Sequence, residues 1–502
     1  MARAAVDREQ LERLLEALES GLVERRQVLR LSLLAALAGE HTLLIGPPGT
    51  AKSALARRIH LAFREARYFE RLLTRFTVPE ELFGPLSIRA LEEDRYERHT
   101  AGFLPDAAVA FIDEVFKANS AILNALLTLL NEREFDNGAG RQRCPLISVV
   151  GATNQVPEDE VAEAFFDRFL LRLVVGPVSG EGFRSLLQAD AATGAAVLDE
   201  AAPPPISDAL QLSAAARAAL ACAAASVGLP APVFALLAEL RAWLSAQQCY
   251  VSDRRWVKIA RLLRMAAASE GRAAVAVWDL GLVPFCVAAE VQAQQAVADW
   301  LAARLGLRET YAPPRLSRVV EAFEAQLKAE REANDLDYDE SGRLRFSSLG
   351  QADALSEAFG GEGDVQGGGA FADERAGELA SAIGDAKGGA GALRMTYTRK
   401  RRYGRRHVAA RTRQIDALLQ RIAGYEAELC AERAALQAWV AQAIWADPAF
   451  IAAAQASLAH TTQALVDLVQ RARAARAGFE ALPRLDTEGT EPAPVEHEPL
   501  LD

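Results

Sequence analysis

The stretch LLIGPPGTAKSALARRI, residues 43–59, combines an apolar run, a glycine-rich turn and the start of a helix. Gly46 and Gly49 permit a tight turn whose backbone N–H groups can face phosphate oxygens. Lys52 supplies a mobile positive charge, and Ser53 offers a hydroxyl ligand for magnesium at the helix N-terminus. The loop is therefore expected to hold a nucleoside triphosphate, and an ordinary Gly/Pro turn is the alternative.

The loop departs from the usual pattern at one position. Glycine normally precedes the lysine, but this chain has Ala51, which we interpret as a variation that still permits the helix to start. The residues expected to bind the nucleotide and its magnesium ion are Gly46, Pro47, Pro48, Gly49, Thr50, Ala51, Lys52, Ser53 and Asp113.

Two later apolar runs end in polar residues. AVAFIDEV ends in Asp113 and Glu114, and adjacent carboxylates at a strand end are costly unless they serve a cation or a reaction. Asp113 is expected to bind magnesium directly or through water, and Glu114 to orient and polarise the attacking water. LISVVGATN ends in Asn154, which is expected to help hold that water, because ligands bind where such strands end.

Two segments supply candidate arginines. AEAFFDRFLLRL places Arg168 at a helix end before a strand, where it could stabilise transition-state charge on the γ-phosphate of an adjacent subunit. Arg172 is a second choice for this role, and a surface ion pair between Arg168 and Asp167 is the non-catalytic alternative. In YVSDRRW, Arg254 fits a sensor of bound phosphate, with Arg255 as its solvated neighbour.

These residues need a scaffold that brings strand ends together. Short β-rich runs alternate with helical ones at residues 42–45, 68–73, 109–112, 146–150 and 171–175. Such alternation predicts an α/β core, a parallel sheet with helices on both faces, followed here by an all-α lid and a helical C-terminal extension.

The domain boundaries follow changes in composition. We expect an α/β nucleotide-binding domain over 1–178, a helical lid over 179–308, a helical leg over 309–333, a Gly-rich and basic linker or degenerate insert over 334–407, a helical hairpin over 408–482 and an acidic disordered tail over 483–502. The interval 334–392 is too glycine-rich to form a substantial core.

Composition excludes several classes of protein. A length of 502 residues with 51% hydrophobic content allows more than one core, and the net charge of -11 disfavours non-specific nucleic-acid binding. The five cysteines show no CxxC pairing, which argues against a disulfide framework or a zinc site. No run approaches the roughly 18 apolar residues of a membrane span, and the N-terminus is charged, so a cytoplasmic location is expected.

Together, GPPGTAKSALARR, TVPEELFGPLSI, the segment from YERHTAGF to LLNEREF, and YVSDRRW resemble the AAA+ ATPases, and more narrowly the RavA group of the MoxR branch. The resemblance covers about residues 8–335. It implies a ring, hexameric in this family, with ATP and Mg²⁺ bound between subunits, Arg168 acting in trans and Arg254 as lid sensor. It also implies a partner with a von Willebrand factor A domain and two insertions, a hairpin near the pore at 80–107 and a hairpin at 131–148.

The resemblance weakens beyond residue 335. RavA proteins carry a small β-rich domain inserted in a helical leg, through which a lysine decarboxylase is bound, whereas this interval is glycine-rich and short of strand-forming residues. The decarboxylase partner is therefore not carried over. NDLDYDESGRLRF lacks the glycine and glutamate of a calcium loop, so we interpret it as an acidic linker.

Three functions remain open at this point. The main expectation is an ATP hydrolase that works as a ring to remodel or activate a bound protein. The alternatives are a nucleotide-controlled scaffold and a nucleic-acid motor or loader, the latter motivated only by the basic run RKRRYGRR at 399–406.

Overall fold

A computed structural model describes residues 7–138, 140–155, 160–193, 206–305, 313–336, 371–373, 378–383 and 394–497. The chain divides into two compact units. The first unit contains Met1–Leu305 and Ala434–Ser457, and the second contains Gly306–Arg433 and Leu458–Asp502. Each unit is described by itself.

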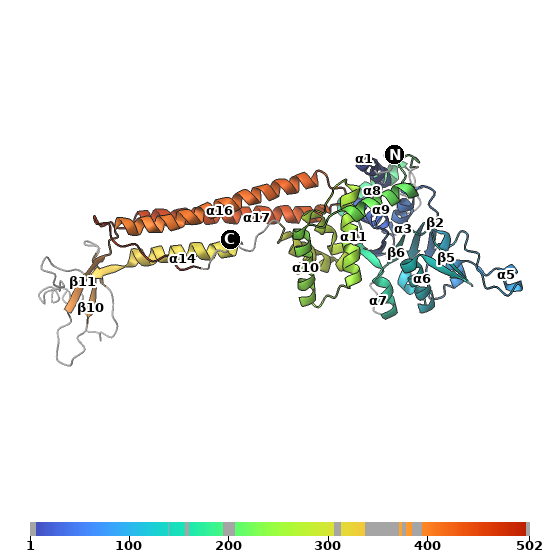
Figure 1. The fold of residues 1–502 in the computed structure, drawn as a ribbon, viewed down its shortest axis with the longest axis horizontal. Coiled ribbons are helices and arrows are strands. Elements are labelled where there is room, and N and C mark those ends of the chain that lie inside the picture. Colours follow the sequence, from blue (N-terminus) through green and yellow to red (C-terminus); the bar gives the residue numbers. More distant parts are fainter. Residues whose placement is uncertain are drawn as a thin grey trace, which may run out of the picture. The chain divides into compact units, whose positions relative to one another are not determined.

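A five-stranded sheet lies at the centre of the first unit (Figure 1). Its order is β2 (Tyr68–Leu72), β3 (Val109–Asp113), β6 (Ser148–Thr153), β1 (His41–Ile45) and β7 (Phe169–Val174). Every neighbouring pair is parallel, with Ile45 of β1 aligned to Thr153 on one side and to Val174 on the other. The predicted α/β core is confirmed, and the carboxyl ends of the strands share one edge.

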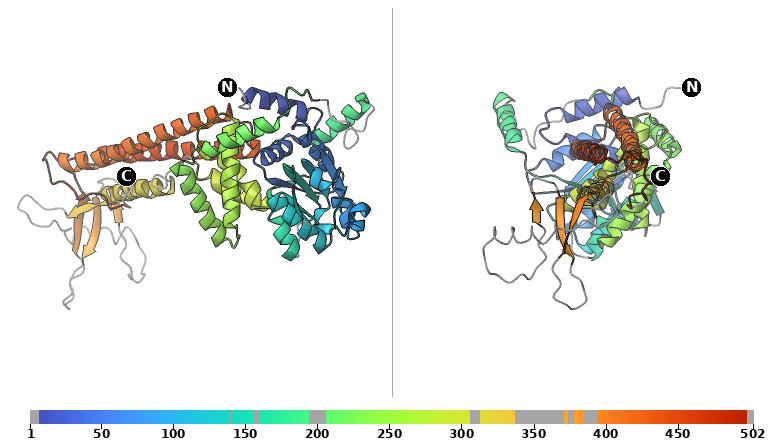
Figure 2. Two further views of the ribbon diagram at one scale, coloured as in Figure 1. Left: turned by 45° about the vertical axis from the view of Figure 1, so that its right-hand side comes forward. Right: turned by 90° about the vertical axis from the view of Figure 1, so that its left-hand side faces the viewer.

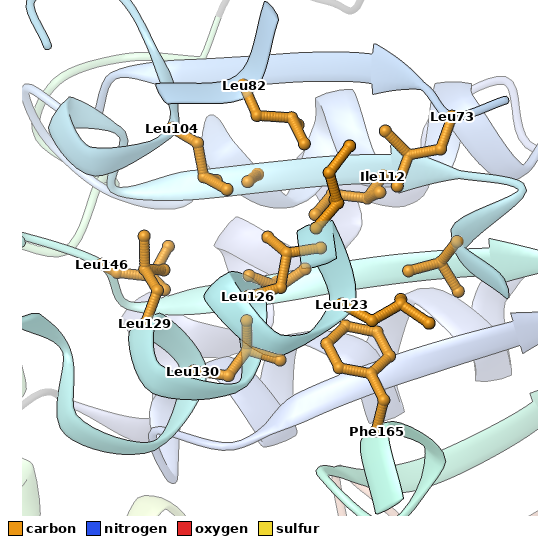
Figure 3. Close-up of a cluster of buried hydrophobic side chains, with 14 of the residues drawn as sticks. Leu73, Leu82, Leu104, Ile112, Leu123, Leu126, Leu129, Leu130, Leu146 and Phe165 are labelled. Carbon is orange, nitrogen blue, oxygen red and sulfur yellow. The ribbon is translucent and has the colours of Figure 1, made fainter. Parts of the chain in front are cut away.

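Helices cover both faces of this sheet (Figure 2). The first four residues of β3, Val109–Ile112, are buried, and because successive side chains point to opposite faces, both faces must be covered. α2 (Arg26–Leu37) contacts β1, β6 and β7, and α3 (Lys52–His60) contacts β3. Leucines of α6 (Ser120–Glu132) pack with Ile112 and with Phe165 of α7 (Glu160–Phe166) in a cluster of buried apolar side chains (Figure 3).

The remaining helices of the first unit come before and after the sheet. α1 (Arg8–Glu19) comes first, and α8 (Gly180–Thr193) follows the last strand. The predicted helical lid is confirmed as α9 (Ala214–Ser226), α10 (Ala231–Ala246), α11 (Asp253–Ser269), η3 (Val277–Leu282), α12 (Pro284–Val287) and α13 (Val291–Ala302). The side chain of Ser252 accepts a bond from the backbone of Arg255, so it caps α11 and fixes where the DRRW segment begins to coil.

The second expected insertion is a β-hairpin, and the first is not. β4 (Glu134–Asn137) and β5 (Gly140–Arg143) pair in antiparallel fashion. The interval 80–107 instead holds α4 (Pro79–Phe83), α5 (Ile88–Glu92) and η1 (Leu104–Asp106), with an isolated bridge between Leu86 and Arg98. The two insertions pack together, since the Asn137 side chain accepts a bond from the Arg98 backbone at 2.6 Å. Ser87 accounts for the helical part of this interval, because its side chain caps the first turn of α5.

The tip of the C-terminal hairpin belongs to the first unit and packs on the lid. α16 (Arg405–Val440) and α17 (Pro448–Glu480) meet there. The Trp445 indole donates to the Ser269 hydroxyl at 2.8 Å, and the Ile444 backbone donates to the buried Glu270 at 2.6 Å. A Cβ on Gly281 would lie 2.4 Å from the Phe450 ring, so glycine is needed for this contact.

In the second unit, α14 (Pro313–Glu332) lies beside the outer parts of α16 and α17 and forms a three-helix leg. Ion pairs join its helices: Arg476–Asp416 at 2.6 Å, Arg471–Glu324 at 2.7 Å and Arg411–Glu330 at 2.9 Å. Among the described helices of the chain, none combines the length and apolar character needed to cross a bilayer.

The glycine-rich interval contains strands that the sequence did not predict. β8 (Asn334–Leu336), β11 (Arg394–Lys400), β10 (Glu378–Ile383) and β9 (Phe371–Asp373) form an antiparallel sheet in that order. Composition was a poor guide here because an antiparallel ladder is built from main-chain hydrogen bonds, and strand propensity depends strongly on context.

The acidic tail and the basic run bind other parts of the second unit. Residues 483–497 were expected to be disordered, yet the Arg406 backbone donates to the Glu488 carbonyl at 2.9 Å, which caps the start of α16. Arg401 donates to Asp335 at 2.8 Å, and Arg406 pairs with the Glu488 carboxylate. Two arginines of the basic run therefore contact acidic groups of their own chain.

Candidate active site

The glycine-rich loop connects the end of β1 to the start of α3. A Cβ on Gly46 would lie 2.1 Å from the Val175 carbonyl oxygen, so only glycine allows this approach of two backbones. Gly49 has a φ of +77° and open space around it. Ala51 is buried and has a φ of 64°, in the left-handed region, so it does not begin the helix as expected but adopts a conformation that favours glycine.

Lys52 and Ser53 occupy the first turn of α3. Lys52 is 9% exposed, and its ammonium donates to the carbonyls of Gly46 and Pro47, both at 2.8 Å. The Thr50 hydroxyl donates to the same Pro47 carbonyl at 3.0 Å. These bonds hold the loop closed around the lysine, next to the partial positive charge of a helix N-terminus.

Asp113 and Glu114 end β3 beside this loop. Burial raises the pKa of Asp113, the charge of Lys52 opposes that rise, and the charges of Glu114 and Glu70 add to it. α3, which begins at Lys52, packs on β3, which ends at Asp113, so the lysine and the aspartate come from neighbouring elements. Glu114 has a φ of 50° and its side chain is 20% exposed, with Lys117 at 3.3 Å. A non-glycine residue in this conformation is a form of strain that is common at functional sites.

Asn154 lies at the same edge of the sheet. It follows β6 and is exposed. The residue before it, Thr153, accepts a bond from the Gly46 backbone at 2.9 Å. The three sequence motifs therefore meet at the carboxyl edge of the sheet, around the start of α3.

The two candidate arginines lie elsewhere. Arg168 immediately precedes β7, whose first residue, Phe169, pairs with His41 at the start of β1. Because the strands are parallel, Arg168 lies at the amino edge, a strand length of about 16 Å from the phosphate-binding loop. Burial, and then the charge of Arg254, lower the pKa of Arg168, so the two guanidinium groups are near each other.

Arg254 reaches the amino edge from the lid. It is exposed and donates to the Asn131 side chain at 2.9 Å, near the end of α6. His41 marks the same edge, since its imidazole contacts the carbonyl of Leu130, the residue before Asn131, at 3.2 Å. The Arg168 Nε atom is buried without a hydrogen-bond partner. This edge thus carries two arginines close to each other and near a neutral amide.

The other two arginines have structural roles. Arg255 was expected to be solvated but is 3% exposed. Its guanidinium donates to the carbonyl and carboxylate of Asp167 and to three further carbonyls, those of Phe169, Leu170 and Cys286. The sequence could not show this because all but one of these acceptors are backbone atoms distant along the chain.

Arg172 is not available as an arginine finger, the residue expected to stabilise transition-state charge on the γ-phosphate of an adjacent subunit. It is buried on β7 with its guanidinium carbon 3.8 Å from the centre of the Phe166 ring, and burial lowers its pKa to about 9. Asp167 is engaged by Arg255 at 3.1 Å and lies 3.9 Å from Arg172, which disfavours the simple ion pair between Asp167 and Arg168.

Sequence reasoning missed Arg25, which contacts the phosphate-binding loop. It is 8% exposed, and its Nε donates to the Thr50 carbonyl at 3.1 Å. Arg25 lies between α1 and α2 and belongs to no recognised motif, so the sequence alone did not identify it.

Comparison with known proteins agrees with this geometry. A family model described as the MoxR domain in MoxR-vWA-beta-propeller ternary systems matches residues 9–207, and a model of an AAA lid domain matches residues 232–301. An uncharacterized protein of Methanocaldococcus jannaschii is 41% identical over 275 residues, which is 54% of this chain and 68% of that protein.

Other relatives match over shorter segments. A second uncharacterized protein of M. jannaschii is 53% identical over 166 residues, 33% of this chain and 44% of that protein. The protein MoxR of Paracoccus denitrificans is 30% identical over 165 residues, 32% of this chain and 48% of its own length. Among solved structures, a candidate ATPase from Cytophaga hutchinsonii aligns with a TM-score of 0.45 and 17% identity, covering 56% of this chain and 86% of that one.

The fold and the two family models define an AAA+ ATPase with a helical lid. The chain belongs to the MoxR family of these ATPases.

Proposed function

We propose that this protein hydrolyses ATP with Mg²⁺ in a ring of identical subunits, and that hydrolysis remodels or activates a partner protein. The observation that carries the proposal is the separation of the two halves of the site. Lys52, Asp113 and Glu114 meet at the carboxyl edge of the sheet, and Arg168 and Arg254 lie together at the amino edge.

The carboxyl edge fits a magnesium nucleotide. The turn at Gly46 and Gly49 leaves the loop backbone free of side-chain bulk, and the α3 N-terminus and Lys52 attract anionic phosphates. The Ser53 hydroxyl and Asp113 carboxylate are hard oxygen donors of the kind that Mg²⁺ uses together with phosphate oxygens. Within the described residues there is no cluster of three or more His, Cys, Asp or Glu that would form a separate metal site.

Each residue at this edge has one role in phosphoryl transfer to water. Lys52 neutralises charge on the phosphates, and Glu114 orients and polarises the attacking water. Asn154 holds that water from the neighbouring strand. Bound Mg²⁺ supplies further charge neutralisation.

The amino edge explains why a ring is needed. Arg168 lies at the edge of the sheet opposite its own phosphate-binding loop, and Arg254 bonds to Asn131 at that same edge, so neither reaches the nucleotide of its own subunit. Two nearby arginines need an anion, and the γ-phosphate held by a neighbour supplies one. Both arginines therefore act in trans, and a hexamer is the assembly implied by the resemblance to other AAA+ proteins.

The partner is proposed on family grounds. The matching family model is described by systems that combine MoxR, a vWA component and a β-propeller component. We therefore propose a protein with a von Willebrand factor A domain as partner. The leg with its inserted antiparallel sheet supports a RavA-like organisation, in which the inserted sheet is the place for partner binding.

Two substitutions test this function. Lys52→Ala should abolish ATP binding, measured with a fluorescent nucleotide, because it removes the charge that faces the phosphates. Glu114→Gln should bind ATP normally and lose turnover by orders of magnitude, because only water activation is lost. Nucleotide affinity that survives Lys52→Ala would remove the foundation of the proposal.

The Glu114→Gln variant also separates remodelling from scaffolding. It should assemble on ATP and retain its partner, so a pull-down from native lysate should be enriched in a vWA-domain protein. If the variant preserved the partner's active state in cells, turnover would be incidental and the protein would act as a scaffold.

A further inference from the structure

The strongest feature outside the recognised motifs is a two-residue clip between α1 and α2, formed by Glu24 and Arg25. The Arg25 guanidinium makes three hydrogen bonds, all to backbone carbonyls: Nε to Thr50 at 3.1 Å, Nη2 to Gly176 at 2.7 Å and Nη1 to Glu24 at 3.0 Å. One side chain therefore joins the phosphate-binding loop to the segment that follows β7.

Glu24 binds the same segment a little further along the chain, at Ser179. Its carboxylate accepts from the Ser179 backbone at 2.7 Å and also from the Ser179 hydroxyl. The Ser179 hydroxyl in turn accepts from the Gly182 backbone at 3.1 Å, which caps the start of α8. Glu24 has a φ of 55°, an unfavourable conformation for glutamate that this pair of contacts holds in place.

The phosphate-binding loop meets this segment at a second point. At the start of the loop, Gly46 approaches the Val175 carbonyl so closely that a Cβ would lie 2.1 Å from it. At the end of the loop, Arg25 binds Thr50. Both ends of the loop are thus connected to residues 175–182, and a shift of the loop cannot leave this segment unmoved.

The charge of Arg25 adds a second argument. The guanidinium is 8% exposed, and among the ion pairs of the described residues it has none. Burial lowers the pKa of Arg25, and the charge of Glu24 only partly opposes this. A buried cation is costly unless it is compensated, and an anion bound beside Thr50 would compensate it.

We propose that Arg25 is a positioning residue that couples the phosphate-binding loop to residues 175–182, so that nucleotide binding changes the order of this segment and of the start of α8. The inference rests on the proposed nucleotide site and deepens it. It assigns the first step by which the nucleotide state reaches the lid.

The test compares Arg25→Gln with Arg26→Gln in the full-length protein. Arg26 is the adjacent arginine, 73% exposed and 3.8 Å from Glu19, so it is a matched control. Backbone hydrogen–deuterium exchange is measured with and without ADP at saturating concentration. In the wild type and in Arg26→Gln, ADP should slow exchange over 176–187. In Arg25→Gln, ADP should no longer slow exchange over 176–187. ADP affinity should also fall about ten- to a hundredfold, because the variant lacks the charged hydrogen bonds of the arginine.

Arg25→Lys separates charge from geometry. A lysine keeps the charge but cannot reach Thr50 and Gly176 with a planar fork. We expect it to recover most of the ADP affinity and little of the exchange effect. A purely electrostatic role would restore both, and a purely structural role would show as a stability loss that leaves the ADP-dependent exchange intact.

Glu24→Gln provides an independent test if Arg25→Gln fails to fold. It leaves the bond to Thr50 in place and weakens the contact with Ser179, so ADP affinity should hold while the exchange effect at 179–182 shrinks. An unchanged ADP effect over 176–187 in a variant that still binds ADP would overturn the inference alone. ADP binding that persists in Lys52→Ala would instead overturn the proposed site.

Discussion

The two edges of the central sheet carry different halves of one chemistry. At the carboxyl edge, burial raises the pKa of Asp113 and the charge of Lys52 opposes that rise, so this edge combines a cation and a carboxylate of one subunit. At the amino edge, burial and then the charge of Arg254 lower the pKa of Arg168, and Arg254 bonds to the neutral Asn131. In the proposed function, the first edge holds the nucleotide of its own subunit, and the second acts on the nucleotide of a neighbouring subunit.

The largest expected effect concerns this second edge. Arg168→Ala should lower ATP turnover by about a thousandfold, the scale of other arginine fingers, with little change in nucleotide affinity. Mixing Arg168→Ala with Lys52→Ala subunits creates interfaces where an intact loop faces an intact arginine. Turnover should therefore partly return in mixed rings, measured by phosphate release.

The contrast between the two edges would be contradicted if mixing Arg168→Ala with Lys52→Ala subunits restored no ATP turnover. Rings shown to contain both subunits, yet inactive, would mean that Arg168 serves its own subunit or no site at all. Phe166→Leu is a useful control, because it disturbs the neighbouring stack on Arg172 without removing a candidate finger.

The next prediction distinguishes the structural role of Arg255 from the proposed functional role of Arg254. Arg255→Ala removes a buried guanidinium that serves Asp167 and several carbonyls, so the free energy of unfolding should fall by about 3 kcal/mol or more. Arg254→Ala should leave stability within about 0.5 kcal/mol, as surface substitutions usually do, while turnover falls. Denaturant titration and phosphate release measure the two properties.

The opposite outcome would make Arg254 the structural residue and Arg255 the functional one. If Arg254→Ala unfolded the protein and Arg255→Ala left stability intact but slowed turnover, the buried arginine would be the phosphate sensor.

The same contrast explains what the sequence could predict. Residues 46–53 and Asp113 with Glu114 were identified because each motif is contiguous and its local backbone dictates its chemistry. The expectation that Arg255 is solvated was wrong because its burial depends on β7 carbonyls far along the chain. Arg25 was missed for a similar reason, since its acceptors in the loop and at Gly176 are backbone atoms that no side-chain pattern reveals.

The sheet in the second unit shows the same limit at the level of the fold. β10 and β11 pair through backbone groups over residues that composition assigned to a linker. The parallel sheet of the first unit was predictable because its inner strands are buried on both faces and therefore read as largely apolar runs.

A smaller effect tests the packing of the amino edge through pH. His41 begins β1, where its Nδ1 accepts from the Val149 backbone at 3.0 Å and its Nε2 contacts the Leu130 carbonyl. Burial lowers the pKa of His41 from 6.5 to about 3, so the folded protein keeps the ring neutral. Below pH 6.5 the unfolded chain binds a proton that the folded chain does not. Stability from this residue is therefore complete above pH 6.5 and falls by about 2 kcal/mol between pH 6.5 and 5.

His41→Asn provides the comparison, because asparagine can still accept from the Val149 backbone but does not titrate. The variant should be less stable at pH 7 and should lack this part of the pH slope in urea titrations between pH 5 and 6.5. Equal slopes in the two proteins would show that another group governs acid sensitivity at this edge.

The smallest expected effect returns to the carboxyl edge and to the alanine that departs from the usual pattern. Ala51 adopts a φ of 64°, which costs an alanine about 1 kcal/mol that glycine does not bear, although glycine also loses more entropy on folding. Ala51→Gly should thus raise the free energy of unfolding by up to about 1 kcal/mol with turnover unchanged. Gly49→Ala is the matched opposite, since its φ of +77° strains an alanine while no atom lies within 4 Å of the added Cβ, so stability should fall by about 1 kcal/mol. If Ala51→Gly instead lowered turnover, the strained backbone at this position would itself contribute to catalysis. The function of the carboxyl edge would then depend on backbone conformation as well as on its charged side chains.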